Sequence, residues 1–306
     1  MPDLGWLTEP YHYDFMQRAL IAALIVGAIA PLVGTWIVLR RLSYLGDAMS
    51  HATVGGVAVA YLGGWSITVG AIGAGLAMAG MMSVLETHPR LREDAIIGAV
   101  EAALFAAGIV VITSSHSISI DLTHLLFGSI TTVTDADLLR SAALGGGCLA
   151  LLALLFRDLR AATFDPQHAV LVGIPTGLLR FVLYVLLAIT VVLGLQSVGL
   201  LMSVALFVIP PAAARLWSGT VRRMAALAAC FGVGSSLAGL TISYHAGSAP
   251  GATIALCSVA ILAISFVATL PRRVRPVHRD ARPRRARPAR RALRRGARLA
   301  ARSRGR

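Results

Sequence analysis

Long runs of uncharged residues dominate this chain. Residues 19–39 provide 21 such positions, residues 52–85 and 181–214 provide 34 each, and residues 224–270 provide 47, interrupted only by His245. A membrane-spanning helix needs about 20 mostly apolar residues, so the longer runs exceed one crossing and predict helical hairpins. With 57% hydrophobic and 14% charged residues, the composition argues against a water-soluble enzyme and against a disordered chain.

Glycine, proline and polar residues interrupt the longer runs and indicate where each hairpin turns. The breaks fall at Gly63 and Gly64, at residues 196–197, and at residues 244–251. The sequence therefore predicts an all-α fold, a polytopic transmembrane helical bundle of about nine spans, or eight to ten if one re-entrant piece is miscounted. Residues 114–137 are expected to form an interfacial or re-entrant helix. The nine expected spans cover residues 15–39, 47–63, 67–85, 95–113, 138–156, 178–196, 198–215, 224–243 and 251–270.

The charge is concentrated at one end of the chain. All 28 basic residues are arginine, and residues 271–306 hold 16 of them against one acid, whereas residues 1–270 hold 12 against 13 acids. The near-neutral body does not favour a specific nucleic-acid partner. We expect three parts: an extracytoplasmic segment 1–14, a transmembrane domain 15–270, and a disordered cytoplasmic tail 271–306 near anionic lipid head groups.

The arginines also predict an orientation in the cell membrane. Cytoplasmic loops accumulate positive charge, and the arginines between the expected spans recur in alternate loops. With the N-terminus outside and the C-terminal tail in the cytoplasm, these basic loops all lie inside. They hold Arg40 and Arg41; Arg90 and Arg92; Arg157, Arg160 and Arg180; and Arg215, Arg222 and Arg223.

Two ionisable residues open the second expected span. Asp47 and His51 are four residues apart, so they share one helical face, with Ser50 beside them. A carboxylate and an imidazole together suit a borderline divalent ion such as Zn²⁺ or Mn²⁺. The alternative is a mutually satisfied Asp–His pair near the interface. The predicted topology puts Asp47 near the cytoplasmic end of its span, so either the helix starts before Leu45 or the preceding loop dips into the bilayer.

Two further ionisable residues lie in or at the end of expected spans. Glu101 appears as a buried acid that lines a pathway, pairs with His51 or is protonated and structural, and His245 lies at an outer helix end. The sequence contains no phosphate-binding P-loop and no hydrolase motif. Intramembrane hydrolysis and intrinsic ATPase activity therefore have no support in the sequence, and we expect a protein that is not an enzyme and has no cofactor of its own.

A short cytoplasmic segment precedes the sixth expected span. Asp165 and Pro166 resemble a helix cap, and an amphipathic helix is expected to continue to Gly173. Such a helix could dock a cytosolic partner or serve as an ordinary connector. Residues 199–214 form a span that contains Pro210 and Pro211, which bend a helix and free backbone carbonyls.

These segments together resemble a known family. The run from Val38 to Ala52 is similar to a stretch in the membrane subunits of bacterial ABC importers for zinc, manganese or iron, the ABC-3 family. Further segments match that family in the same order, and the resemblance covers about residues 15–270. They are residues 93–98, 124–128, 165–173 and 199–214, with a looser match at 243–254.

The resemblance implies a permease that works as a homodimer or pseudo-dimer with a cytosolic ABC ATPase and an extracytoplasmic metal-binding protein. It implies that Asp47 and His51 contact a transported divalent ion, with zinc and manganese preferred and iron as a further candidate. It also implies that residues 165–173 form the helix that couples to the ATPase. Glu101 and the arginine tail have no counterpart in this pattern.

Other functions remain open at the sequence level. A permease for a metal chelate or vitamin would need a wider and less charged cavity. The Asp47–His51 pair argues against that alternative. A membrane enzyme lacks a recognisable motif, and a scaffold would not explain ionisable residues inside spans.

Overall fold

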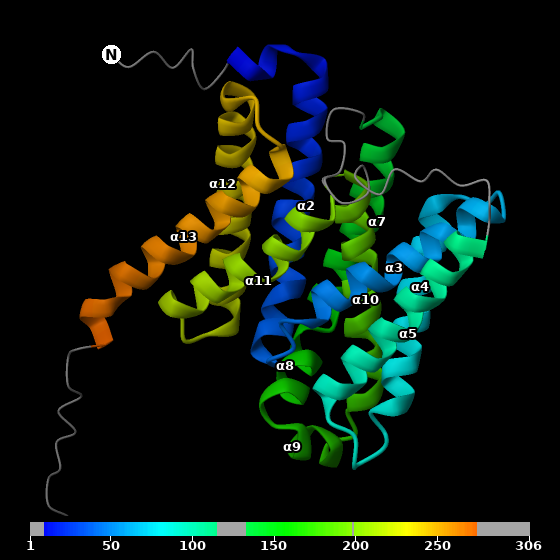
Figure 1. Ribbon diagram of the computed structural model, residues 1–306. Coiled ribbons are helices and arrows are strands. Elements are labelled where there is room, and N and C mark those ends of the chain that lie inside the picture. The colour runs from blue at the N-terminus through cyan, green and yellow to red at the C-terminus, as the bar shows by residue number, and fades with distance from the viewer. Residues whose placement is uncertain (1–8, 115–132, 198, 274–306) are drawn as a thin grey trace, which may run out of the picture. The chain divides into compact units, whose positions relative to one another are not determined.

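The computed structural model describes residues 9–114, 133–197 and 199–273, and within these ranges the regular structure is helical (Figure 1). Each expected span coincides with one long helix. These helices are α2 (Asp14–Leu39), α3 (Leu45–Leu62), α4 (Ile67–Leu85), α5 (Glu93–Ser114), α7 (Asp135–Leu154), α10 (Thr176–Ser197), α11 (Leu200–Trp217), α12 (Val221–Ala246) and α13 (Pro250–Arg273). The shorter helices are η1 (Glu9–His12), α8 (Phe156–Phe164) and α9 (Pro166–Leu171).

The helices have the length and apolarity of membrane spans. Among the described residues, seven are long and apolar enough to cross a bilayer, and the apolar part of α11 is shorter. Of the nine long helices in the described ranges, α3 is neither among these seven nor the shorter apolar one, and it carries Asp47 and His51. The polytopic helical bundle predicted from the sequence is therefore confirmed. The predicted interfacial helix at 114–137 lies mostly outside the described residues, as does the arginine tail beyond Arg273.

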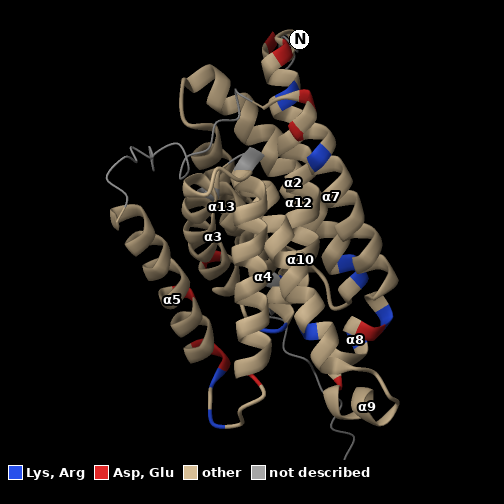
Figure 2. Ribbon diagram, turned by 90° about the vertical axis from the view of Figure 1, so that its right-hand side faces the viewer, with Lys and Arg blue, Asp and Glu red and all other residues tan. Residues whose placement is uncertain are grey.

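The chain divides into two units, residues 1–268 and 269–306. Within the first unit, α2 and α10 are the most enclosed long helices. Helix α2 packs against α12, α11, α10 and α7, whereas α3, α4 and α5 pack against one another and are linked to α2 by α10 and α11. Figure 2 shows charged residues at the start of α2 and at the α4–α5 turn, on opposite ends of mostly uncharged helices. This distribution suits a bundle with an apolar middle.

Glycines allow the helices to approach closely. A side chain at Gly27 of α2 would collide with Gly232 and Ser236 of α12, and one at Gly55 of α3 would collide with α5 at Leu104 and Gly108. Small residues bring backbones together in this way in membranes, where dispersion contacts rather than water exclusion hold helices together.

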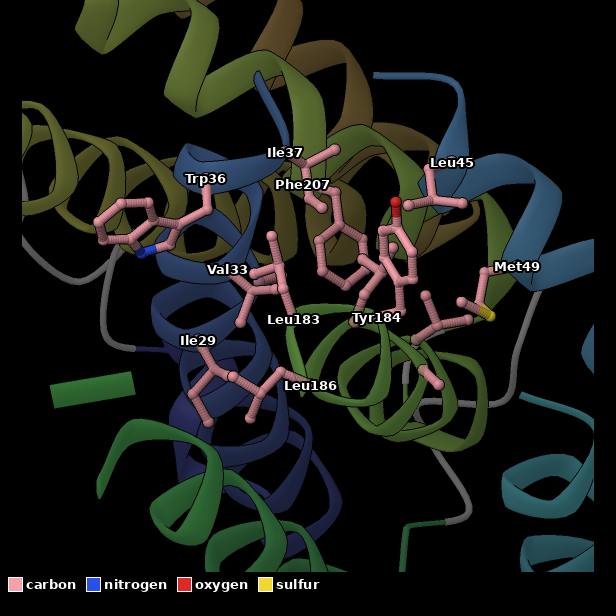
Figure 3. Packing of buried hydrophobic residues seen from close by; sticks show 14 of the residues in the cluster. Ile29, Val33, Trp36, Ile37, Leu45, Met49, Leu183, Tyr184, Leu186 and Phe207 are labelled. Carbon is pink, nitrogen blue, oxygen red and sulfur yellow. The ribbon is translucent and has the colours of Figure 1, made fainter. Parts of the chain in front are cut away.

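The first turn of α3 lies inside the core and not at its edge. Figure 3 shows Leu45 and Met49 near Tyr184 of α10 and Phe207 of α11, and all four are fully buried or nearly so. A Cβ atom at Gly46 would lie 3.8 Å from the side chain of Phe207, near the middle of α11. Helix α3 begins at Leu45, so of the two explanations for the depth of Asp47, the structure favours the one in which the preceding loop enters the bundle.

Candidate metal site

Asp47 and His51 face each other across one turn of α3. The Nε2 atom of His51 lies 3.8 Å from Oδ1 of Asp47, and their side chains are 36% and 35% exposed. Two ligands that each bind one ion at about 2.1 Å are separated by at most about 4.2 Å. The separation of the pair is therefore compatible with contact to a single divalent ion.

Burial divides α3 into two faces. Leu45, Met49 and Ala52 are fully buried against the neighbouring helices. Asp47 and His51 lie on the other face and remain half-exposed within one copy of the chain. An ionisable pair left open in the middle of an apolar bundle is costly unless water, an ion or another polypeptide covers it.

Helix α5 supplies the neighbours of this open face. The ring of Phe105 packs edge-on against His51, with centroids 5.6 Å apart. The Glu101 carboxylate lies beside the phenol of Tyr44, the residue before α3, and as a nearby hydrogen-bond acceptor it raises the pKa of Tyr44. Glu101 was predicted to be buried, but it is half-buried. Its neighbour in the structure is Tyr44, which the sequence analysis did not propose as a partner.

Tyr44 is the residue that the sequence analysis missed. It lies three residues before Asp47, one helical turn away, and its electrostatic neighbours include both Glu101 and Asp47. A phenol at that spacing from an intramembrane carboxylate is the signal that could have found it.

Two other predicted site residues do not join the pair. The hydroxyl of Ser50 is fully buried and donates a 2.9 Å hydrogen bond to the Gly46 carbonyl inside the helix. His245 is exposed in the last turn of α12, where its ring packs against Tyr244. In Figure 1 that helix end lies beside the start of α2, away from the first turn of α3.

Within the described ranges, no group of three or more His, Cys, Asp or Glu side chains could hold a metal ion together. Asp47 and His51 are thus a two-ligand set in one copy of the chain. Such a set leaves several coordination positions for water or for ligands from elsewhere, which suits an ion that must also leave.

The predicted cytoplasmic segment forms a short helix with strong end signals. Asp165 accepts a 3.0 Å hydrogen bond from the backbone N–H of His168, and Pro166 occupies the first helical position of α9. Gly173 follows in the left-handed region, at φ +80°. The segment exposes apolar side chains outside the long helices, at Phe164, Val170, Leu171 and Val172. Exposed apolar groups of this kind are typical of a surface that contacts another protein or the membrane.

Residues 12–269 match the family described as the ABC 3 transport family. The chain belongs to the ABC 3 transport family. The family resemblance read from the sequence is thereby confirmed, and with it the assignment of the chain as a transport permease of a multi-pass membrane family.

Curated relatives in the ABC 3 family carry metal-transport names. The manganese transport system membrane protein MntC of Halalkalibacterium halodurans is 38% identical over 254 residues, which cover 83% of this chain and 87% of that protein. A probable iron transport system membrane protein of Haemophilus influenzae is 35% identical over 261 residues, covering 85% and 96%.

Solved structures agree with this relationship. The structure of PsaBC from Streptococcus pneumoniae in complex with Fab matches with a TM-score of 0.76 and 35% identity, covering 85% of this chain and 94% of that chain. An inward-facing conformation of a putative metal-chelate type ABC transporter matches with a TM-score of 0.66 at 18% identity, which supports the fold alone.

Proposed function

We propose that this chain is the permease of an importer that moves a divalent metal ion, foremost Mn²⁺, into the cell. The observation that carries the proposal is the Asp47–His51 pair, half-exposed and 3.8 Å apart on the open face of α3. Relatives at 35–38% identity are named for manganese or iron transport, and the pair suits Mn²⁺, Fe²⁺ and Zn²⁺.

We propose three partners for this chain, because a single copy leaves the open face of α3 and the apolar surface of α8 and α9 uncovered. A second copy of the permease would cover the open face of α3 and could bring a second Asp47–His51 pair to the ion. A cytosolic ATPase would dock on the exposed apolar surface of α8 and α9, with residues 165–173 as the coupling segment. An extracytoplasmic metal-binding protein would deliver the ion at the opposite end, with the N-terminus outside and the tail in the cytoplasm.

A metal chelate is the alternative cargo. One relative, 32% identical, is named the chelated iron transport system membrane protein YfeD of Yersinia pestis. The Asp47–His51 pair favours a bare ion as cargo. In a chelate, the coordination positions of the metal are already filled, so two protein ligands could not bind the metal directly.

Radiolabelled manganese uptake by cells with equal amounts of each variant tests the proposal. Asp47→Asn keeps the shape of the side chain and removes the anionic ligand, whereas His51→Leu removes the imidazole and suits an apolar bundle better. Each variant should insert normally and lose uptake. Asp94→Asn, which alters an exposed carboxylate at the start of α5, is the matched control and should retain uptake. Near-normal uptake by both Asp47→Asn and His51→Leu would remove the pair from the mechanism.

A further inference from the structure

A cluster of charged side chains lies at the end of the bundle that carries α8 and α9. The side chain of Glu86, which follows α4, is 4% exposed and accepts a 2.9 Å hydrogen bond from Nη1 of Arg180. The hydroxyl of Tyr184 donates to the same carboxylate, and Glu93 lies 3.8 Å from Nη1 of Arg180. The desolvation of such a buried pair offsets most of its attraction, so the cluster is weak evidence for stability alone.

Arg40 connects this cluster with α8. Its Nε donates a 3.3 Å hydrogen bond to the hydroxyl of Thr163 in α8. Arg40 also lines a cavity of about 290 Å³ together with Glu93, Arg180 and Tyr184. Burial lowers the pKa of Arg40, an effect that the nearby Tyr184 and Glu93 oppose. A guanidinium remains charged under these conditions, so Arg40 is a fixed cation between two helices and the cluster.

The chain between Arg40 and the metal pair is short and held in shape. Arg41 adopts a left-handed conformation at φ +64°, and the N–H of the next residue, Leu42, bonds to the Ile37 carbonyl at 3.0 Å. Leu42 is buried, and its carbonyl accepts from the N–H of Leu45, the first residue of α3. A tight turn with buried and hydrogen-bonded residues passes a displacement on rather than absorbing it.

We infer that Arg40 is a positioning residue that ties the α8–α9 segment to the metal helix α3. Its bond to Thr163 and its place beside the Glu86–Arg180 pair fix the start of the turn from which Asp47 follows seven residues later. This inference rests on the proposed function, because it assigns to α8 and α9 the docking of the ATPase. Movement of these helices on ATP binding then shifts Arg40 and, through the turn, the metal pair.

The test uses the complete transporter, permease with ATPase and extracytoplasmic protein, in proteoliposomes. Manganese uptake and ATP hydrolysis are measured together for Thr163→Val and Thr163→Ser. Valine keeps the shape and removes the acceptor of the Arg40 hydrogen bond, and serine restores the hydroxyl. We expect uptake per ATP hydrolysed to fall about tenfold with valine, the scale of one lost charged hydrogen bond, and to return with serine. Manganese binding by the purified permease should be unchanged in both variants.

Arg92→Met serves as the control, because Arg92 forms an exposed ion pair with Asp94 in the segment between α4 and α5. An unchanged ratio in Thr163→Val overturns the inference, as does a parallel fall in uptake and hydrolysis or a failure of serine to restore the ratio. If wild-type vesicles take up no manganese, the proposed function fails and the inference falls with it. If they do, and valine leaves the ratio intact, the inference alone is wrong.

Discussion

Arg180 of α10 donates a 2.9 Å hydrogen bond to Glu86, whose carboxylate is almost completely buried after the last turn of α4. Removal of one member of a buried pair leaves the other without compensation, which costs about 3–5 kcal/mol when both are enclosed. Arg180 is 37% exposed, so solvent screening reduces the cost.

We therefore expect Glu86→Gln to lower the free energy of unfolding by about 1–2 kcal/mol, below the fully buried range. Thermal unfolding of the purified permease in detergent measures this change. Asp94→Asn breaks an exposed pair and should leave the unfolding temperature unchanged. Equal unfolding temperatures for Glu86→Gln and the wild type would show that the pair adds no stability.

The left-handed glycine after α9 gives a second prediction. At φ +80°, Gly173 has a conformation that other residues adopt only with strain, of about 1–2 kcal/mol. Gly173→Ala should distort the α9 end, and Gly173→Trp should in addition block the docking surface, with loss of both ATPase co-purification and uptake. Gly177→Ala, at an open helical position in α10, should preserve both. Normal ATPase binding by Gly173→Trp would exclude this segment from coupling.

The sequence predicted the helices well because membrane spans depend on composition over about 20 residues. Helices α3, α10 and α12 end at Leu62, Ser197 and Ala246, each at or close to a break predicted at Gly63 and Gly64, at residues 196–197 and at residues 244–251. The Asp47–His51 pair was also predictable, since an i,i+4 spacing places two side chains together within one helix. Contacts between helices were not, because no periodicity shows that Tyr44 meets Glu101 or that Arg180 meets Glu86.

Close packing of α5 against α3 gives a third prediction. A Cβ atom at Gly108 would overlap the backbone of Gly55, whereas one at Gly98, also in α5, would meet no atom within 4 Å. Gly108→Val should therefore separate the helices, move Phe105 away from His51 and lower the free energy of unfolding by about 1–3 kcal/mol more than Gly98→Val. Unfolding temperatures of the two purified variants provide the comparison, in which equal values would contradict the packing.

The proximity of Tyr44 to Glu101 predicts a particular pH behaviour. The neighbouring Glu101 carboxylate raises the pKa of the Tyr44 phenol above the value of about 10 at which tyrosine normally ionises, so the hydroxyl stays protonated below that pH. Tyr44→Phe should reduce manganese uptake by removing the hydroxyl that lies next to Glu101 beside the metal pair, yet leave the shape of its pH profile unchanged between pH 7 and about 9. A difference in shape between the two profiles would show that Tyr44 titrates in this range.

The orientation of the bundle can be tested at two exposed turns. Trp65 lies in the α3–α4 turn, and Thr87 lies in the α4–α5 turn at the other end of α4. The arginine pattern places Trp65 outside and Thr87 in the cytoplasm. In a chain whose native cysteines are replaced by alanine, Trp65→Cys should react with a membrane-impermeant maleimide in intact cells, and Thr87→Cys should react only after lysis. The native positions to replace are Cys148, Cys230 and Cys257. The opposite labelling pattern would invert the topology, and it would place α8 and α9 on the side of the membrane where no ATPase can reach them.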